Sequence, residues 1–422
     1  MVRKMKHTEI GDIPVDWELQ TFEETFRVLS NNTLSRDNLN NRGGAVRNIH
    51  YGDILTKFPE VLDCHEEDIP YINDLSLLTS STQLLQDGDI VVADTAEDET
   101  VGKITEVQNL GDSKLVAGLH TIPCRVKKGD FAPGWLGYYM NSDLFHNQIL
   151  PYITGIKVSS ISKGAISETL ILIPPFDEQE KIVQSLNEVQ LLMTAETKVV
   201  NKIKFVKNGC LSKMFPQKDD TVPEMRLPGF TDAWEQRKLG DIVGIYDGVH
   251  QTPNYQNSGV MFLSVENIAT LISSKFISEE DFKRDYKVFP QENDILMTRI
   301  GDVGTTNVVT DNGLKAFYVS LALLKYKSTD PYFLSNAIQS DYVQKGLANR
   351  TLKTAIPMKI NKDEIGKVSV MLPVSATEQQ QIGTYFRNLD NLITLHQRKC
   401  DKYSNIKKGM MSDLLKGKIR LV

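Results

Sequence analysis

The second half of this 422-residue chain repeats the first half. Glu178-Gln179 recurs as Glu378-Gln379, and the offset of 200 positions then continues through the segment that follows each motif. Upstream the two copies drift apart, although Trp17 in DWEL is echoed by Trp234 in AWEQ. Internal self-similarity constrains a fold strongly, because each copy should build the same unit. We therefore expect two related units, each a variable globular part followed by a more closely matched tail.

Each tail carries the apolar periodicity of one long helix. Apolar residues recur at alternating steps of four and three from Ile182 to Met214, and again from Ile382 to Leu414, with a few polar interruptions. A mean spacing of about 3.5 residues is typical of a coiled coil. Because a globular part separates the two helices in the chain, they can pair with each other in antiparallel orientation.

The globular parts mix short β-rich runs with helical patches, which predicts α/β or α+β domains of ordinary size. The predicted fold is thus a mixed α/β (α+β) architecture with two globular domains, two long helices pairing as an antiparallel coiled coil, and a pseudo-two-fold internal repeat. The predicted segments are a first domain at 1–175, a first spacer helix at 176–216, a second domain at 217–374 and a second spacer helix at 375–422.

Composition excludes several classes of protein. The chain has no signal-like apolar segment near its start and no apolar run approaching the ~18 residues of a membrane span, so we expect a cytoplasmic protein with no membrane partner. Its four cysteines are widely scattered, which favours reduced thiols over disulfides or a zinc site. Residues 1–180 carry 15 Lys and Arg against 28 Asp and Glu, whereas 181–422 carry 33 against 26. The acidic first part by itself argues against a nucleic-acid reader, which usually has a basic face.

One segment resembles a catalytic motif. Residues 173–176, IPPF, are similar to the Asn-Pro-Pro-Phe of amino-methyltransferases, but Ile173 replaces the asparagine that would bond the target amino group. The second copy lacks the motif, and the chain has neither a GxxxxGK[ST] phosphate loop nor an HExxH metal motif. We therefore interpret the prolines as a stop between strand and helix, and predict no catalytic residue, metal or bound cofactor.

Two different heads on a helical spacer would suit the reading of two separated sites on double-stranded DNA. Asn and Gln can bond adenine through two hydrogen bonds, and Arg or Lys can bond guanine. Polar loops supply such side chains in both heads, although each could equally be a solvated turn residue. The candidates are Asn31, Asn32, Thr33, Arg36 and Asn38 in the first head, and Gln251, Thr252, Asn254, Tyr255 and Arg299 in the second.

The run LPGFTDAWEQRKLGD at 227–241, together with the Pro, Glu-Gln and Ile pattern that leads each long helix, resembles the specificity (S) subunit of type I restriction–modification enzymes. The resemblance covers essentially the whole chain and implies two target-recognition domains that read a bipartite DNA target. It also implies two methyltransferase (M) subunits and, for cleavage, restriction (R) subunits. S-adenosylmethionine, ATP and Mg²⁺ would then belong to those partners, and the S chain would not be an enzyme by itself.

The same resemblance offers an answer to the charge objection, because M subunits would share the neutralisation of phosphates. Local contributions are expected from Lys157, Lys163, Lys353 and Lys359, beside the strand–helix junctions. The duplication would provide two similar docking surfaces for two identical M subunits. The alternatives are a structural coiled-coil adaptor and a self-contained DNA methyltransferase or nuclease.

Two polar residues interrupt the apolar seams at equivalent positions, Glu196 in the first helix and His396 in the second. In an antiparallel pair with aligned ends they would lie within about one helical turn of each other, near the symmetry centre. Polar residues inside such seams are best known for fixing register. We predict that this pair sets the register of the two helices; the alternative is that both side chains point to water.

Overall fold

The computed structural model describes residues 4–155, 157–217 and 220–421. They fold into two compact units, unit 1 (Met1–Ala195 with Lys399–Val422) and unit 2 (Glu196–Arg398). Each unit combines one globular head with one half of each long helix. The units therefore cut across the four segments that we predicted from the sequence. Across the described parts of the chain, every helix is too short or too polar to span a lipid bilayer.

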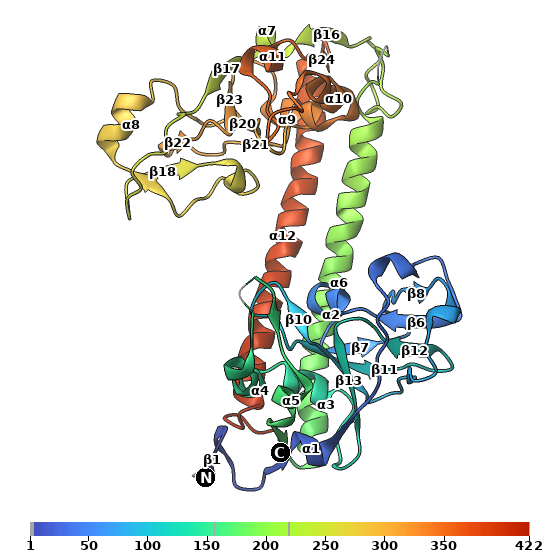
Figure 1. Ribbon diagram of the computed structural model, residues 1–422. Coiled ribbons are helices and arrows are strands. Elements are labelled where there is room, and N and C mark those ends of the chain that lie inside the picture. Colours follow the sequence, from blue (N-terminus) through green and yellow to red (C-terminus); the bar gives the residue numbers. More distant parts are fainter. Residues whose placement is uncertain (1–3, 156, 218–219, 422) are drawn as a thin grey trace. The chain divides into compact units, whose positions relative to one another are not determined.

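The two tails form helices α6 (Phe176–Lys213) and α12 (Ala376–Leu414), shown in green and red in Figure 1. In unit 2, Lys207 Nζ donates to Asp390 Oδ1 at 2.5 Å, and three residues further along α6 the Cys210 thiol contacts the Tyr385 hydroxyl at 3.3 Å. As the residue numbers rise along α6, the residue numbers of the contacting partners on α12 decrease. The helices are therefore antiparallel, as the repeat predicted.

Each helix starts where its prolines end a strand, so the interpretation of Pro174-Pro175 as a stop is confirmed. Strand β15 (Leu170–Ile173) precedes α6, and β24 (Ser369–Leu372) precedes α12. Gln179 Nε2 donates to Pro174 O at 2.8 Å, and Gln379 Nε2 donates to Pro373 O at 2.9 Å. The repeated glutamine thus joins the first turn of the helix to the proline that precedes it.

The first head contains two main sheets, with strand orders β4-β13-β9-β11-β7 and β12-β6-β8-β5. The sequence of β9 (Ile90–Ala93) is wholly apolar because both faces of this central strand are covered: Ile90 and Val92 enter one core cluster, and Val91 and Ala93 enter another. The other elements are β1 (Met5–Thr8), β2 (Gly11–Pro14), β3 (Glu18–Thr21), α1 (Phe22–Thr25), β4 (Phe26–Val28), β5 (Leu39–Asn40), β6 (Val46–Ile49), α2 (Tyr51–Thr56), β7 (Val61–Asp63), β8 (Tyr71–Ile72), β10 (Thr95–Ala96), β11 (Ile104–Gln108), β12 (Lys114–Ala117), β13 (Thr121–Val126), α3 (Trp135–Met140), α4 (Asp143–Ile149), β14 (Ser159–Ser160) and α5 (Lys163–Ser167).

The second head repeats this plan with sheets β17-β23-β20-β21 and β19-β18-β22. Its central strand β20 (Ile295–Thr298) also alternates, with Ile295 and Met297 in one cluster and Leu296 in the other. The remaining elements are β16 (Glu235–Lys238), α7 (Leu239–Ile242), β17 (Gly244–Asp247), β18 (Val260–Leu263), β19 (Phe276–Ile277), α8 (Glu279–Asp285), β21 (Thr306–Val308), β22 (Lys315–Phe317), β23 (Leu321–Lys325), α9 (Pro331–Gln339), α10 (Asp341–Arg350) and α11 (Lys362–Gly366).

Candidate nucleic-acid interface

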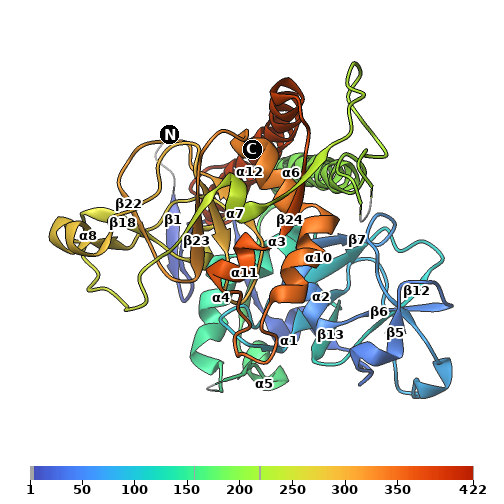
Figure 2. The same cartoon turned by 90° about the horizontal axis from the view of Figure 1, so that it is seen from above.

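Three strands of the first head end at one edge. Strands β6 and β12 are parallel and adjacent in both views (Figures 1 and 2). Gly118 N donates to Ile49 O at 2.8 Å, and Asp94 N donates to His120 O at 3.1 Å, so the residues that follow the strands meet. In α/β sheets the carboxyl ends of parallel strands commonly form the binding side. We call residues 49–53, 93–96 and 117–121 the first carboxyl edge.

The predicted reading loop of the first head is fastened to this edge. Asn31 Nδ2 donates to Gly118 O at 3.2 Å and to Thr121 O at 2.9 Å. Arg36 forms a two-pronged ion pair with Asp53, with bonds of 2.8 and 2.9 Å, yet its side chain stays half exposed. Thr33 is exposed between them. The loop therefore presents Thr33 and Arg36 outward, while Asn31 anchors it.

The second head has an equivalent edge. Strands β18 and β22 are parallel, and they lie next to each other in Figures 1 and 2. Val249 N donates to Phe317 O at 3.2 Å, and Arg299 N donates to Ser320 O at 2.9 Å. These bonds join the start of the predicted reading loop and the end of β20 to the parallel pair. We call residues 247–250, 263–264, 298–300 and 317–320 the second carboxyl edge.

The exposed loop after this edge carries the predicted readers of the second head. Gln251, Thr252 and Asn254 are exposed and line a hollow of about 610 Å³ opposite α8. Tyr255 is 46% exposed, and its ring stands edge-on to Phe262 with centroids 5.6 Å apart. An exposed aromatic ring that is held in place can contact a base without losing much side-chain entropy.

The structure argues against a base-reading role for Asn32 and Arg299. Asn32 is 6% exposed; its Nδ2 donates to Asn48 Oδ1 at 2.7 Å, and its Oδ1 accepts from Leu34 N at 3.0 Å. Arg299 is 5% exposed, donates from Nε to Ile360 O at 3.1 Å and pairs through Nη1 with Asp247. The sequence predicted both residues as readers because of their loop positions. Their polar atoms instead form hydrogen bonds within the protein, at the two carboxyl edges.

The four predicted phosphate-contacting lysines, Lys157, Lys163, Lys353 and Lys359, are exposed. Their segments are attached to the edges: Ser160 pairs with Thr95 directly after β9, and Lys359 pairs with Ile300 directly after β20. Positive charge therefore flanks each candidate reading surface at corresponding places.

Sequence reasoning missed His120 and Tyr51 at the first edge, and His250 and Tyr318 at the second. His250 directly precedes the predicted reader Gln251, whereas His120, Tyr51 and Tyr318 follow other strands, so only strand pairing brings these three beside the predicted loops. A histidine or tyrosine in a turn gives no signal of such a position by itself.

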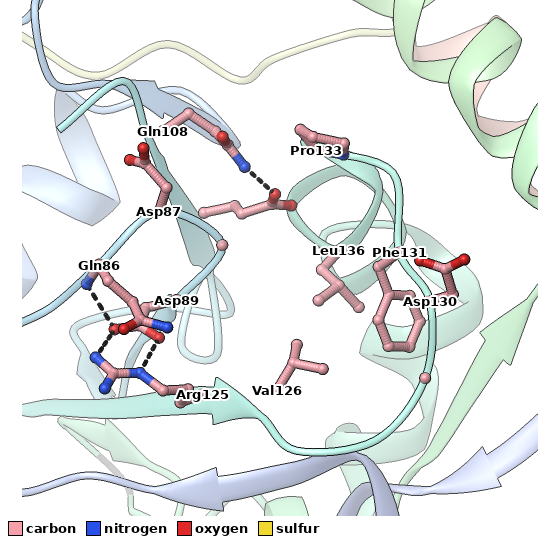
Figure 3. Close-up of a pocket in the computed structure, with 13 residues that line it drawn as sticks. Gln86, Asp87, Asp89, Gln108, Arg125, Val126, Asp130, Phe131, Pro133 and Leu136 are labelled. Carbon is pink, nitrogen blue, oxygen red and sulfur yellow. Dashed lines mark hydrogen bonds and ion pairs between the residues drawn. The ribbon is translucent and has the colours of Figure 1, made fainter. Parts of the chain in front are cut away.

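Unit 1 contains a hollow of about 330 Å³ that is lined partly by polar residues bonded within the protein (Figure 3). Arg125 donates to both oxygens of Asp89 at 2.7 and 2.6 Å. Glu106 is 2% exposed and accepts from Gln108 Nε2 and from Gly134 N, both at 2.6 Å; burial raises the pKa of this carboxyl group. These polar groups serve internal contacts. Within residues 4–155, 157–217 and 220–421, no three His, Cys, Asp or Glu side chains are grouped to hold a metal ion.

In unit 2, Glu196 and His396 face each other, with the imidazole Nδ1 bonded to the carboxylate and both side chains less than one-fifth exposed. The two side chains point to each other rather than to water. Their role in helix register stays a prediction.

Comparison with known proteins shows what this chain is similar to. Residues 231–402 match the model of the type I restriction modification DNA specificity domain. The type I restriction enzyme MjaX specificity subunit of Methanocaldococcus jannaschii is 24% identical over 99% of this chain and 96% of its own length. The MjaVIII specificity subunit of the same organism is 22% identical over 63% of this chain and 66% of its own. The chain is thus similar to type I specificity subunits over nearly its whole length.

The fold of this chain agrees with that of solved structures. The S subunit of the type I restriction–modification system from M. genitalium superposes with a TM-score of 0.60 at 14% identity, covering 98% of this chain and 99% of that one. A chain from a structure on complex assembly and conformational transition of the type I R-M system gives a TM-score of 0.51 at 16% identity, covering 96% and 99%. These likenesses show that the chain has the fold of the solved subunits.

Proposed function

We propose that this specificity subunit selects a bipartite target in double-stranded DNA, with each head reading one half. The observation that carries the proposal is the equivalence of the two carboxyl edges. Each combines a parallel strand pair, an attached polar loop and flanking exposed lysines, while the exposed side chains differ between heads: Thr33 and Arg36 in the first, Gln251 and Asn254 in the second. Equivalent scaffolds with different exposed side chains suit two different half-sites.

The lysines would contact phosphates and position the DNA, whereas the loops would contact base edges. Lys157 and Lys163 would act for the first head, and Lys353 and Lys359 for the second. Because the first 180 residues are acidic, neutralisation of the phosphates would be shared with partner subunits.

The helices offer two equivalent docking surfaces for M subunits. In unit 1, Leu192 of α6 and Ile406 of α12 are 48% and 40% exposed; in unit 2, Val206 of α6 and Leu392 of α12 are 41% and 43% exposed. Leu192 and Leu392, like Val206 and Ile406, are counterparts at the offset of 200. We propose that each pair belongs to an apolar contact surface, since contiguous exposed apolar patches mark interaction sites. Two copies of one surface fit two copies of one partner.

We propose that the chain binds no cofactor itself. S-adenosylmethionine would be bound by the M subunits, and ATP and Mg²⁺ would be needed by the R subunits during cleavage. The cytoplasm, where the DNA lies, is the proposed site of action.

The test is a reconstituted complex of this chain with its M subunits, incubated with a duplex library and labelled methyl donor. We expect methylation confined to sequences with two defined halves at a fixed separation. Exchange of residues 226–372 for the second head of a relative should alter one half only. Methylation without sequence preference would favour a structural adaptor, and methylation by the purified chain alone would favour a self-contained methyltransferase.

A further inference from the structure

His120 occupies a strained and firmly held position at the first carboxyl edge. It lies in the turn between β12 and β13 with a backbone φ of 54°, a left-handed conformation that is uncommon for residues other than glycine. Asn31 fixes both sides of this turn by bonding Gly118 O and Thr121 O. The side chain is nevertheless 46% exposed. Backbone strain that the surroundings maintain commonly accompanies binding sites.

Neighbouring side chains orient the imidazole ring. The ring meets Tyr51 edge-on, with centroids 5.3 Å apart. Its Nδ1 lies 3.3 Å from Thr95 Oγ1 and 3.4 Å from Asp94 Oδ1. Nδ1 therefore faces the protein, and Nε2, on the other side of the ring, is the nitrogen available to a ligand.

The same contacts determine which nitrogen carries the proton in the neutral ring. The Thr95 hydroxyl donates its single proton to Asp94 Oδ1 at 2.7 Å. The Thr95 oxygen can then only accept from His120, so the proton is on Nδ1. Nε2 of neutral His120 is consequently a hydrogen-bond acceptor.

We propose that His120 is a specificity-determining residue of the first head, whose Nε2 accepts a hydrogen bond from an exocyclic amino group in the major groove. Adenine N6 and cytosine N4 are the two groups of this kind. Asp94 is the positioning residue that sets the ring's proton through Thr95. The inference rests on the proposed reading of DNA by the first head and names a contact within it.

The second head differs at the equivalent position. Arg299 N bonds to Ser320 O as Asp94 N bonds to His120 O, so Ser320 corresponds to His120. Ser320 is 6% exposed, and its Oγ accepts from Val265 N at 3.1 Å. One head thus presents a side chain here and the other does not, as expected if the position helps to distinguish two half-sites.

The experiment uses the reconstituted complex of this chain with its M subunits and a duplex library randomised across both half-sites. We expect His120→Ala to reduce discrimination at one position of the first half-site by about 10- to 100-fold, with the second half-site unchanged. His120→Gln, which keeps an acceptor, should restore part of the preference. The control is His65→Ala. His65 is exposed and follows β7, at the end of the sheet opposite to the end of β9.

Asp94→Ala gives a readout that a merely structural role would not produce. Without Asp94, the Thr95 hydroxyl can donate to Nδ1 and move the ring proton to Nε2. The preference at that position should then change from adenine or cytosine to guanine or thymine, whose O6 and O4 acceptors replace the amino group.

Unchanged base preferences in an assembled His120→Ala complex would overturn the inference, while selection by the wild-type complex would leave the proposed function intact. Absence of selection by the wild-type complex would instead overturn the proposed function. If His120→Ala fails to assemble, His120→Gln and Asp94→Ala decide: unaltered preferences in both reject the role of His120.

Discussion

Arg420 and Glu178 form a two-pronged ion pair across 242 positions of the chain, with Arg420 Nε and Nη2 donating to the two carboxylate oxygens at 2.5 and 2.7 Å. Glu178 also accepts from Trp17 Nε1 at 2.9 Å. In unit 2 the same network recurs: Arg226 donates to both oxygens of Glu378 at 2.7 and 2.8 Å, and Trp234 Nε1 donates to that carboxylate at 3.3 Å. In each unit, the glutamate at the start of one long helix therefore bonds a tryptophan of the head. It also bonds an arginine from the segment that follows the other long helix.

Arg420→Ala should destabilise unit 1 by about 3 kcal/mol, because it leaves Glu178 buried at 1% exposure without its cation. Denaturant unfolding followed by circular dichroism measures the change. Arg398→Ala, an exposed cation on α12, is the matched control and should cost less than about 0.5 kcal/mol. Equal effects of the two substitutions would contradict the stabilising role of the ion pair.

The loss of folding stability at low pH should depend on Arg420. Its hydrogen bond to Asp16 is the main cause that lowers the pKa of Asp16 below 3.8. A carboxyl group with a depressed folded pKa contributes stability above its unfolded pKa and loses it as pH falls through the folded value. Wild-type protein should therefore lose stability more steeply than Arg420→Ala below about pH 4. Urea unfolding at a series of pH values between 3 and 7 measures this, and parallel curves would count against it.

Glu196 and His396 should be energetically coupled. Glu196→Gln, His396→Gln and the double variant form a cycle in which we expect a coupling of about 1 kcal/mol, because the side chains touch and are mostly buried. If the pair sets helix register, single variants should also tolerate altered separations between half-sites in methylated DNA. Additive effects with an unchanged separation would mean that register is set elsewhere.

Charge placed on one docking surface should remove one M subunit. Leu192→Arg and Leu392→Arg each bury a cation at an apolar contact, so each complex should retain a single M subunit, whereas the double variant should retain none. Native mass spectrometry counts the subunits directly. Asn201→Arg adds the same charge at another exposed position of α6 and should leave two bound. Full occupancy in the double variant would place docking on another surface.

Gln251→Ala and Arg299→Ala should have different consequences. Gln251 is exposed, so its loss should relax one position of the second half-site at a cost of about 1–3 kcal/mol of discrimination, with little effect on stability. Arg299 is buried against Asp247 and Ile360, so its loss should lower the melting temperature of unit 2. Methylation mapping together with thermal unfolding separates the two outcomes. A stable Arg299→Ala protein with relaxed specificity would restore Arg299 as a base reader.

Three features could be predicted from the sequence alone. They are the duplicated Glu-Gln motif, the seven-residue apolar pattern of α6 and α12, and the strand stop at Pro174-Pro175. Each is a local or strictly periodic signal: a helix face repeats every few residues, and proline acts on its own backbone. The antiparallel pairing also followed, because a globular part of the chain separates the two helices. These signals, with the resemblance to a known family, were enough to predict the fold class and the kind of protein.

The reading surfaces depended on tertiary structure. Asn32 and Arg299 share loop positions and polarity with Thr33 and Gln251, yet strand pairing buries the first two and exposes the others. His120 acquires oriented neighbours only because Asp94, at the end of β9, is paired with the turn that follows β12. Long-range strand pairing and burial arise from the packing of segments that are distant in the chain, and no local pattern encodes them.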